Sequence, residues 1–545
     1  MLSLLAIISF VLALAIVPSP SAWSALNKTV GGRLLATIPL GSPCHDPNYD
    51  EALCSTLRRK WRDYPLHIQS PSSVMSPLFV NNSCNPFQPR DTPCELASFV
   101  RYTAAARDAK DVAATVKFAK RHNVRLVIKN TGHDYLGRST GAGALSIWTQ
   151  GMKEIRVRDW ADKGYVGKAL RVGAGVLGSE ALAAARDAGL VVVTGSCPSV
   201  GLAGGYTQGG GHSSLSNAFG LAADNTLSFD VVTASGRLVT ASPWNRHRDL
   251  YWALSGGGGG NFGVVVSLTV KAHPDARVAG AELLIQTQPG MNGVDAVFQV
   301  LPTVIPAIVG AGFTLIHFAN KTQFVGIATG YNKTQASLRR SLEPLETAVK
   351  EEGLTWSASY TEFPHYQDHY EHHFNLPATD ALDLAGITGG GHFFPGPSLA
   401  NLTSVFKDVI AKGATFFGIA LDVSTFGSHM ANAVSPHWRQ ATVSAALCIP
   451  VPAAVTQKEL EANRDKITNE LQPLLEAAAP GTGAYMNEAD FQEPDFQTNF
   501  FGTNYPALLR IKNKYDPHGF FYATAAVGSE KWQVGSDGRL CRRRS

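Results

Sequence analysis

Residues 195–212 read GSCPSVGLAGGYTQGGGH, with seven glycines in 18 residues. Glycine at this density lets the backbone approach a ligand where any Cβ atom would clash. A flexible surface loop is the alternative, but flexible linkers are usually Gly and Ser throughout, whereas Val200, Leu202 and Tyr206 interrupt this run. The stretch therefore predicts a ligand-binding loop, and the lone Cys197 within it is a candidate for covalent attachment to a cofactor.

Regular alternation of helix and strand surrounds this loop. Residues 108–120 place Val112, Val116 and Ala119 on one helical face, and residues 124–128 are typical of a short buried strand. The same unit recurs as a helix over residues 179–188 and an apolar strand over 190–194. Further strands are predicted within 227–240 and at 267–271, and a late helix at 505–514. Units of this kind indicate an α+β or α/β fold.

A second motif, KNTGHDYLG at residues 129–137, directly follows a predicted strand. Gly and small polar residues after a strand expose backbone N–H groups in one concavity, which suits a phosphate. Taken alone, His133 is more often an ordinary loop or core histidine. Its position after the strand nevertheless makes it a candidate functional residue.

Two familiar motifs occur in the wrong context. Gly258, Gly260 and Gly263 match the dinucleotide-binding pattern G-x-G-x-x-G, but residues 264–268 read VVVSL and predict a strand where that motif needs a helix. Residues 137–141 match the G-x-S-x-G nucleophile elbow, but residues 142–148 also predict a strand. Neither a Rossmann domain nor a hydrolase is expected, and we expect no metal site, because no zinc-spaced Cys/His set is present.

The overall composition excludes nucleic acid as the main partner. The formal net charge of the 545-residue chain is only +4, whereas nucleic-acid-binding domains usually concentrate Lys and Arg on one face. The length favours two or more domains.

The N-terminus predicts export. An apolar stretch over residues 4–17, followed by small residues to 22, is too short for a membrane span and is typical of a signal peptide. No later segment reaches about 18 uninterrupted apolar residues, so we expect no membrane anchor. Five sequons would accept glycans in a secretory pathway, at Asn27, Asn81, Asn320, Asn332 and Asn401.

The cysteines agree with an oxidising compartment. Cys44 with Cys54 and Cys84 with Cys94 are each ten residues apart, which suits local disulfides. Seven cysteines cannot all pair. If Cys448 pairs with Cys541, by elimination only, Cys197 is left over.

Three glycine-containing segments, residues 129–137, 195–212 and 249–263, together resemble the FAD domain of the vanillyl-alcohol-oxidase and p-cresol-methylhydroxylase superfamily, and specifically the berberine-bridge-enzyme-like oxidases of the fungal secreted type. The tail adds to the resemblance through residues 485–490, YMNEAD, and residues 504–517. The implied fold is α+β, with an FAD-binding domain of the vanillyl-alcohol-oxidase type plus a substrate domain whose antiparallel sheet is covered by helices. The corresponding divisions are a signal peptide at 1–22, an irregular disulfide-pinned segment at 23–95, the FAD-binding domain at 96–275, the substrate domain at 276–484 and a closing segment at 485–545 that returns to the FAD domain.

The resemblance also implies how FAD is held. His133 would bind the flavin 8α-methyl carbon and Cys197 would bind flavin C6 as a thioether. The residues expected along the pyrophosphate and the isoalloxazine ring are Asn130, Thr131, Gly132, Gly204, Gly205, Gly209, Gly210, Gly258, Gly260, Asn261, Gly263 and Asn487.

The catalytic base is where the sequence departs from the family. Many members carry a tyrosine after the asparagine, but this chain has Glu488, which weakens the reading as a sugar oxidase. The candidates for the catalytic base are Tyr135, Tyr485 and Glu488. Glu488 is included because a carboxylate in an apolar pocket can have its pKa raised toward the working pH. For Glu488, a surface carboxylate or an ion pair is the alternative.

The expected activity is hydride transfer from a small organic substrate to flavin N5, followed by reoxidation by molecular oxygen to give hydrogen peroxide. Alcohols, phenolics, sugars and secondary metabolites are all compatible substrates, and we expect a monomer. One rival is a flavin dehydrogenase that uses another acceptor. Another is a binding protein that keeps FAD for stability only.

Overall fold

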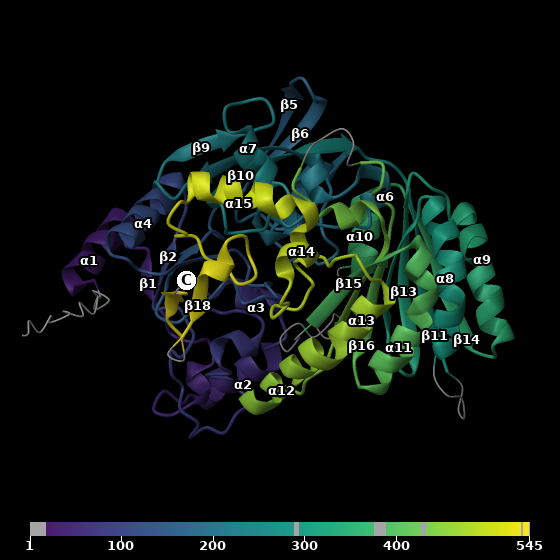
Figure 1. Ribbon diagram of the computed structural model, residues 1–545, viewed down its shortest axis with the longest axis horizontal. Coiled ribbons are helices and arrows are strands. Elements are labelled where there is room, and N and C mark those ends of the chain that lie inside the picture. The colour runs from purple at the N-terminus through teal and green to yellow at the C-terminus, as the bar shows by residue number, and fades with distance from the viewer. Residues whose placement is uncertain (1–17, 288–293, 375–388, 427–431, 536–537, 544–545) are drawn as a thin grey trace, which may run out of the picture.

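The computed structural model describes residues 18–287, 294–374, 389–426, 432–535 and 538–543. The predicted signal peptide therefore lies mostly outside the described residues. Figure 1 shows two regions side by side, with the strands of the first 274 residues on the left and top and a helix-covered sheet on the right.

The first region contains a small sheet in the order β1-β2-β4-β3, formed by Leu34–Ala36, Tyr102–Ala105, Leu145–Trp148 and Leu126–Lys129. Strands β2, β3 and β4 are parallel, and β1 is antiparallel to β2. Helix α4, Ala109–Arg121, begins because the Asp108 side chain accepts the N–H groups of Lys110 and Asp111. Val112, Val116 and Ala119 are buried, as their spacing predicts.

A second, antiparallel sheet of the first region has the order β5-β6-β10-β8-β9, with β7 also paired to β10. Its strands are Ile155–Ala161, Val166–Gly173, Val264–Pro274, Thr226–Val232, Leu238–Ala241 and Leu190–Val191, and helices α5, Gly178–Arg186, α6, Ser216–Phe219, and α7, Arg248–Leu254, lie between them in sequence. Strand β10 directly follows Gly263, and β4 follows residues 137–141. Both misleading motifs therefore lead into strands, as expected.

The second region is one antiparallel sheet in the order β14-β11-β13-β12-β16-β17-β15. Its strands, in chain order β11 to β17, are Val278–Gln286, Thr314–Ala319, Gln323–Tyr331, Thr355–Phe363, Gly389–Pro395, Thr415–Ala420 and Ala441–Cys448. Helices α8, Asp295–Gly310, α9, Gln335–Glu351, and α11, Leu402–Ala411, share a buried apolar core with one face of the sheet. This arrangement confirms the predicted α+β fold.

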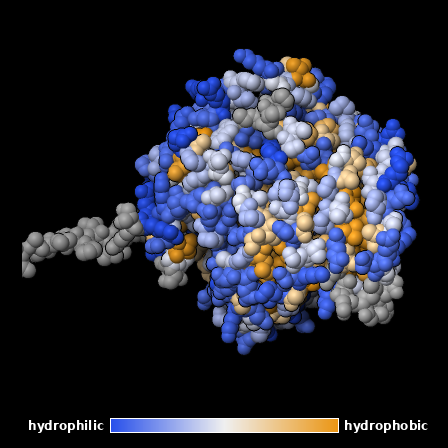
Figure 2. Space-filling view, turned by 45° about the vertical axis from the view of Figure 1, so that its right-hand side comes forward, coloured by the Kyte–Doolittle hydropathy of each residue, from blue (hydrophilic) through white to orange (hydrophobic). Residues whose placement is uncertain are grey.

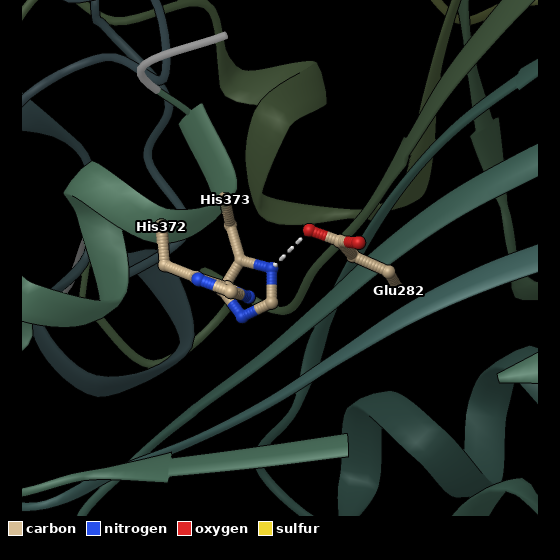
Figure 3. A group of neighbouring side chains, drawn as sticks. All are labelled: Glu282, His372 and His373. Atoms are coloured by element: carbon tan, nitrogen blue, oxygen red, sulfur yellow. Dashed lines mark hydrogen bonds and ion pairs between the residues drawn. The ribbon is translucent and has the colours of Figure 1, made fainter. Parts of the chain in front are cut away.

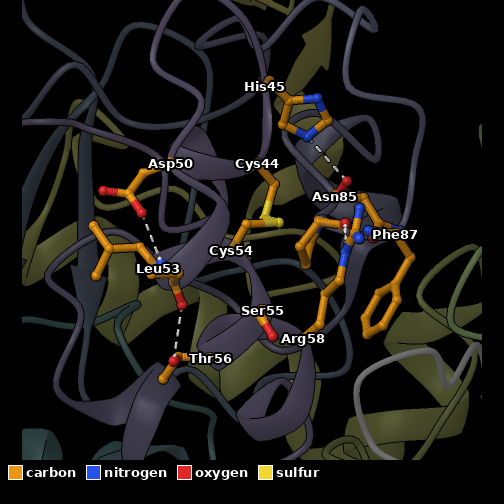
Figure 4. Close-up of a disulfide and its surroundings, with 12 residues drawn as sticks. Cys44, His45, Asp50, Leu53, Cys54, Ser55, Thr56, Arg58, Asn85 and Phe87 are labelled. Carbon is orange, nitrogen blue, oxygen red and sulfur yellow. Dashed lines mark hydrogen bonds between the residues drawn. A yellow bond between two sulfur atoms is a disulfide. The ribbon is translucent and has the colours of Figure 1, made fainter.

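The N-terminal segment contains both predicted disulfides, Cys44–Cys54 and Cys84–Cys94. Figure 4 shows the first of them beside helix α2, Glu51–Lys60, whose N-terminus is capped by the Asp50 carboxylate. The segment is less irregular than predicted, because α1, Pro20–Thr29, α2 and α3, Tyr64–Ile68, lie in it or at its start.

The pairing of Cys448 with Cys541 is wrong. Cys448 is buried at the end of β17, whereas Cys541 is exposed on β19, Leu540–Arg542, and both thiols are free. The two residues lie in different sheets, since β19 pairs only with β18, Trp532–Val534.

The C-terminal segment returns to the first region. Helices α12, Gln457–Lys466, and α13, Gln472–Ala478, precede it, and α14, Phe496–Phe501, and α15, Tyr505–Tyr515, follow. Lys512 on α15 is buried and donates to the carbonyls of Asn261 and Phe521 and to the Asp516 carboxylate. Helix α15 lies beside α7 of the first region (Figure 1).

The surface is predominantly polar on the face shown in Figure 2, where apolar residues form narrow strips between hydrophilic ones. Among the described residues, the structure has no helix with the length and apolar character that crossing a membrane requires. Of the sequon asparagines, Asn81, Asn332 and Asn401 are exposed and Asn27 and Asn320 are partly exposed.

Candidate functional site

The side chains of His133 and Cys197 meet although they come from separate loops. Nε2 of His133 lies 4.0 Å from Sγ of Cys197, and Oγ of Ser199 lies between them, 2.7 Å from the nitrogen and 3.3 Å from the sulfur. Both side chains are partly buried, and Cys197 is in no disulfide. A ligand between the two loops would meet two nucleophilic atoms at one edge.

Lys129, the last residue of β3, anchors the His133 loop through hydrogen bonds of its ammonium group. Its buried Nζ donates to the carbonyl oxygens of Ser70, at 2.9 Å, and of His67 and Thr131. Burial lowers the pKa of Lys129 to about 7. Burial, with the neighbouring His67 and Lys129, also lowers the pKa of His133 to about 3, so the His133 imidazole is neutral near pH 7.

Asn130 brings the first two motifs together. Its Nδ2 donates to Oγ1 of Thr149 and to the carbonyl of Ala174, while its buried Oδ1 has no hydrogen-bond partner in the described part of the chain. A Cβ on Gly201 would lie 1.8 Å from that Oδ1, and a Cβ on Gly204 would lie 3.3 Å from the Asn130 Cγ. Glycine is needed at positions 201 and 204 because the loop of residues 195–212 passes directly over the Asn130 amide.

The glycine run at residues 256–263 lies against the loop of residues 195–212. The N–H groups of Gly256 and Gly258 both donate to the carbonyl of Gln208, at 3.0 and 2.8 Å. A Cβ on Gly259 would lie 2.9 Å from the Cα of Gly205. Gly258 has φ +98°, a backbone region that favours glycine. The three glycine motifs therefore form one continuous backbone surface.

Asn487 joins this surface from the C-terminal segment. Its Nδ2 donates to the carbonyl of Gly205 and to the hydroxyl of Tyr485, both at 2.9 Å, and its Oδ1 accepts from Arg138 at 3.2 Å. A Cβ on Gly209 would lie 2.5 Å from that Nδ2. Asn487 therefore contacts the loop of residues 195–212 and Arg138, which directly follows residues 129–137.

Glu488 points into the protein rather than to the surface. Its Oε1 lies 2.8 Å from Nε2 of His212, the last residue of the glycine run, and its Oε2 is buried without a partner among the described residues. A Cβ on Gly391 of β15 would lie 2.4 Å from the Glu488 carbonyl, so the substrate sheet supports this turn. Glu488 was predicted as a candidate base, but its partner His212 was given no role by the sequence analysis.

The tyrosines near the site are held in their protonated form. Burial raises the pKa of Tyr135, Tyr206 and Tyr485 well above its usual value, and the nearby Glu488 carboxylate raises it further in each. Burial also raises the pKa of the Cys197 thiol, although hydrogen bonds from Ser199 oppose this. The charge of Glu488 therefore acts on both of the other predicted candidate bases, Tyr135 and Tyr485.

These residues fit the flavin that the sequence resemblance implies. Gly204 is partly exposed and Gly205 exposed within an otherwise buried loop, and a Cβ on Gly205 would come no closer than 4.0 Å to another atom. Among the residues that the structure describes, the buried Oε2 of Glu488 has no hydrogen-bond partner, so it is available to a polar ligand. An exposed stretch of glycine backbone near such a group suits a planar, hydrogen-bonding ligand.

Some predicted contact residues lie elsewhere. Asn261 is fully buried and its amide donates to the carbonyl of Val527, and a Cβ on Gly263 would lie 2.5 Å from Val231. The remaining predicted glycines flank the site, with Gly132 against Ser73, Gly210 near Trp438 and Val434, and Gly260 near Ile128, while Thr131 is buried above Lys129.

Comparisons with known proteins agree with this geometry. Residues 100–242 match the model of an FAD binding domain, and residues 484–528 match the berberine and berberine like model. The chain is 44% identical over 529 residues to the FAD-linked oxidoreductase ZEB1 of Gibberella zeae, covering 96% of this chain and 93% of ZEB1.

Solved structures extend the comparison. The VAO-type flavoprotein MtVAO615 from Myceliophthora thermophila superimposes with a TM-score of 0.92 at 36% identity, covering 97% of this chain and 99% of that one. A glucooligosaccharide oxidase from Acremonium strictum, described as containing 6-S-cysteinyl, 8α-N1-histidyl FAD, shares the fold with a TM-score of 0.64 at 19% identity, over 79% of this chain and 92% of that one.

Proposed function

The chain belongs to the berberine-bridge-enzyme-like FAD-linked oxidoreductases of the vanillyl-alcohol-oxidase superfamily, and we propose that it is an exported oxidase with FAD bound covalently through both His133 and Cys197. It oxidises a small alcohol, phenolic, sugar or secondary metabolite and reduces oxygen to hydrogen peroxide. The observation that carries this proposal is the 4.0 Å separation of His133 Nε2 and Cys197 Sγ. Bound FAD would accept a hydride at N5 and return the electrons to oxygen.

The state of the two side chains supports double attachment. With its pKa lowered to about 3, His133 has a free lone pair on one ring nitrogen at neutral pH. Cys197 is free although the described residues hold two disulfides, and Ser199 keeps its thiol beside the histidine. Attachment through both sites would also prevent loss of FAD outside the cell.

Glu488 is the residue that takes the substrate proton. Of the three candidates, Tyr135 and Tyr485 are poor bases in their neutral form, because raising a phenol pKa above 10 leaves fewer than about one molecule in 10³ ionised at pH 7. Glu488 has one oxygen oriented by His212 and a second oxygen without a partner. That second oxygen accepts the hydroxyl or amine proton of the substrate as hydride leaves the adjacent carbon.

His212 then acts as a positioning residue. Its Nε2–H donates to Glu488 Oε1, and its ring packs edge-on to Tyr485 with centroids 5.3 Å apart. The contact holds the carboxylate in one rotamer at the rim of the glycine loops.

Location and assembly complete the proposal. The apolar N-terminus, the two disulfides and the five accessible sequons support export with glycosylation. The protein is further proposed to be a monomer; on the one face that Figure 2 shows, apolar residues form narrow strips.

The activity is tested by screening candidate substrates for anaerobic bleaching of the flavin and then comparing oxygen with an artificial dye as the acceptor. An oxidase releases hydrogen peroxide at a rate matching substrate consumption. Dye reduction without hydrogen peroxide would identify the rival dehydrogenase. A flavin that dithionite bleaches but no substrate does would identify the binding protein.

A further inference from the structure

Helix α10, Tyr366–Phe374, contacts both the loop of Cys197 and the substrate sheet. The Tyr370 hydroxyl donates to the Gly195 carbonyl at 3.1 Å, and the Tyr366 hydroxyl lies 2.6 Å from Oγ of Ser214. His369 and His373, on the same buried side of the helix, contact strands of the substrate sheet, with their ring centroids 4.5 Å apart. The proposed flavin chemistry uses none of these histidines.

Gly280 of β11 makes the space that the two imidazoles occupy. A Cβ at this position would lie 2.5 Å from Nε2 of His373 and 2.8 Å from Cε1 of His369. Neighbouring Ala279 and Ala281 point into the apolar core, so Gly280 and Glu282 share the opposite face of the strand with the helix. On this face of β11, Gly280 leaves room for the two imidazoles, and Glu282, two residues later, supplies a carboxylate.

Glu282, His372 and His373 gather at this point (Figure 3). Nδ1 of His373 lies 2.9 Å from Oε1 of Glu282, and one ligand atom from each of the three residues lies within 4.8 Å of the others. His373 is fully buried, the Glu282 side chain is 43% exposed and His372 is exposed. The group is rigid on its inner side and open to solvent on its outer side.

The hydrogen bonds of His373 fix the orientation of its ring. Its Nδ1 is bonded to Glu282, and its Nε2 lies 2.9 Å from Oγ1 of Thr361 on β14. A cation that replaced the proton between Nδ1 and the Glu282 carboxylate would find both ligand atoms in place, with Thr361 holding the far nitrogen. An imidazole whose far nitrogen is fixed by an oxygen is the usual arrangement at metal ligands.

We propose that Glu282, His372 and His373 bind a divalent transition-metal ion of the Zn²⁺ class. Two imidazoles and one carboxylate form a ligand set that Zn²⁺ accepts, with water completing four-coordination on the open side. Ligand atoms around tetrahedral zinc are about 3.3 Å apart, so the cluster must close slightly. His372 and Glu282 are the exposed members and can move to do so.

Bound metal would join the C-terminal end of α10 to β11. Because Tyr370, on the same helix, holds the carbonyl of Gly195 two residues before Cys197, the metal is expected to stabilise the protein rather than to take part in the oxidation. Sequence spacing predicted no metal site, since Glu282 lies about 90 residues from the two histidines and no local motif joins them.

The test uses the full-length holoenzyme, stripped with a chelator, dialysed and titrated with Zn²⁺ against a chromophoric competitor. Wild-type protein should bind one zinc that His372→Ala and Glu282→Gln bind at least tenfold more weakly, and zinc should raise the unfolding temperature of wild type but not of these variants. His372 is exposed and Gln is isosteric with Glu, so both variants should fold. His365→Ala is the matched control, since this exposed histidine pairs with Asp275 outside the cluster and its variant should bind zinc like wild type.

Zinc binding by wild type that both variants retain unchanged would overturn the proposal, as would wild type that binds no zinc at micromolar concentration. Flavin content and turnover are expected to be the same for His372→Ala and wild type without added metal. The outcome is therefore independent of the proposed oxidase activity.

Discussion

Replacing Glu488 by Gln should abolish most of the substrate oxidation while leaving the flavin attached. The amide oxygen still accepts from His212, so the 2.8 Å contact and the local fold survive. The buried position of Oε2, which has no partner among the described residues, becomes an NH₂ group and costs about 1–3 kcal/mol of unfolding free energy. The variant should therefore fold with a modestly lowered unfolding temperature.

The rate loss follows from the missing base. A positioned general base contributes about 10²- to 10⁴-fold, which corresponds to roughly 3–5 kcal/mol of activation free energy. We expect the anaerobic flavin-bleaching rate at saturating substrate, measured by stopped flow, to fall by that factor. Tyr485→Phe should lose less than about tenfold, because the neutral Tyr485 hydroxyl accepts hydrogen bonds from Asn487 and from the Gly211 backbone and takes no proton.

Glu493→Gln is the control for this experiment, since Glu493 is a buried carboxylate of the same segment and is not part of the proposed site. It should bleach at the wild-type rate. Flavin reduction by Glu488→Gln within threefold of wild type would refute the assignment of the base. So would an equal loss in the Glu493 variant.

Three further changes test packing and charge. Lys512→Met should lower the unfolding free energy by about 3–5 kcal/mol, because it leaves the Asp516 carboxylate buried without its cation. Burial raises the pKa of Glu493 to about 7, above its ordinary 4.5, so its contribution to stability falls as pH rises between these values. Glu493→Gln should therefore raise the unfolding free energy by about 1–3 kcal/mol at pH 8, with no gain near pH 4. Gly201→Ala should cost about 1–3 kcal/mol and reduce flavin loading, since its Cβ would meet Asn130.

Thermal and denaturant unfolding measure all three. Gly310→Ala is the matched control for Gly201→Ala, because a Cβ there meets nothing within 4 Å. A Lys512→Met protein as stable as wild type, a Glu493→Gln gain that is the same at pH 4 and pH 8, or full flavin loading of Gly201→Ala would each contradict the corresponding argument.

Local patterns in the sequence were sufficient for many of the elements. Asp108 marks the start of α4 because a carboxylate at that position satisfies free N–H groups, and the spacing of Val112 and Val116 sets its buried face. The run of valines after Gly263 is β10, and this strand excludes the dinucleotide-binding motif. The domain boundary near residue 275 was predicted from a shift in composition, and in the structure β10 ends at Pro274 and β11 begins at Val278.

Contacts between distant residues were beyond reach of such patterns. His212 meets Glu488 across 276 positions, and Glu282 meets His373 across 91, with no local sequence signal for either contact. The elimination argument for Cys448 failed because it assumed that cysteines pair whenever their number allows. Burial at the end of a strand protects a thiol equally well.

Covalent attachment is the most direct test of the account. The purified protein should be precipitated with acid, washed and measured by intact mass after glycan removal, alongside His133→Ala, Cys197→Ala, the double variant and Cys541→Ala as a free-cysteine control. Wild type and Cys541→Ala should keep a yellow chromophore and the mass of one FAD, each single variant should keep it through the remaining bond, and the double variant should lose it. Release of all flavin from wild type on denaturation, or attachment that survives in the double variant, would contradict the proposed double attachment.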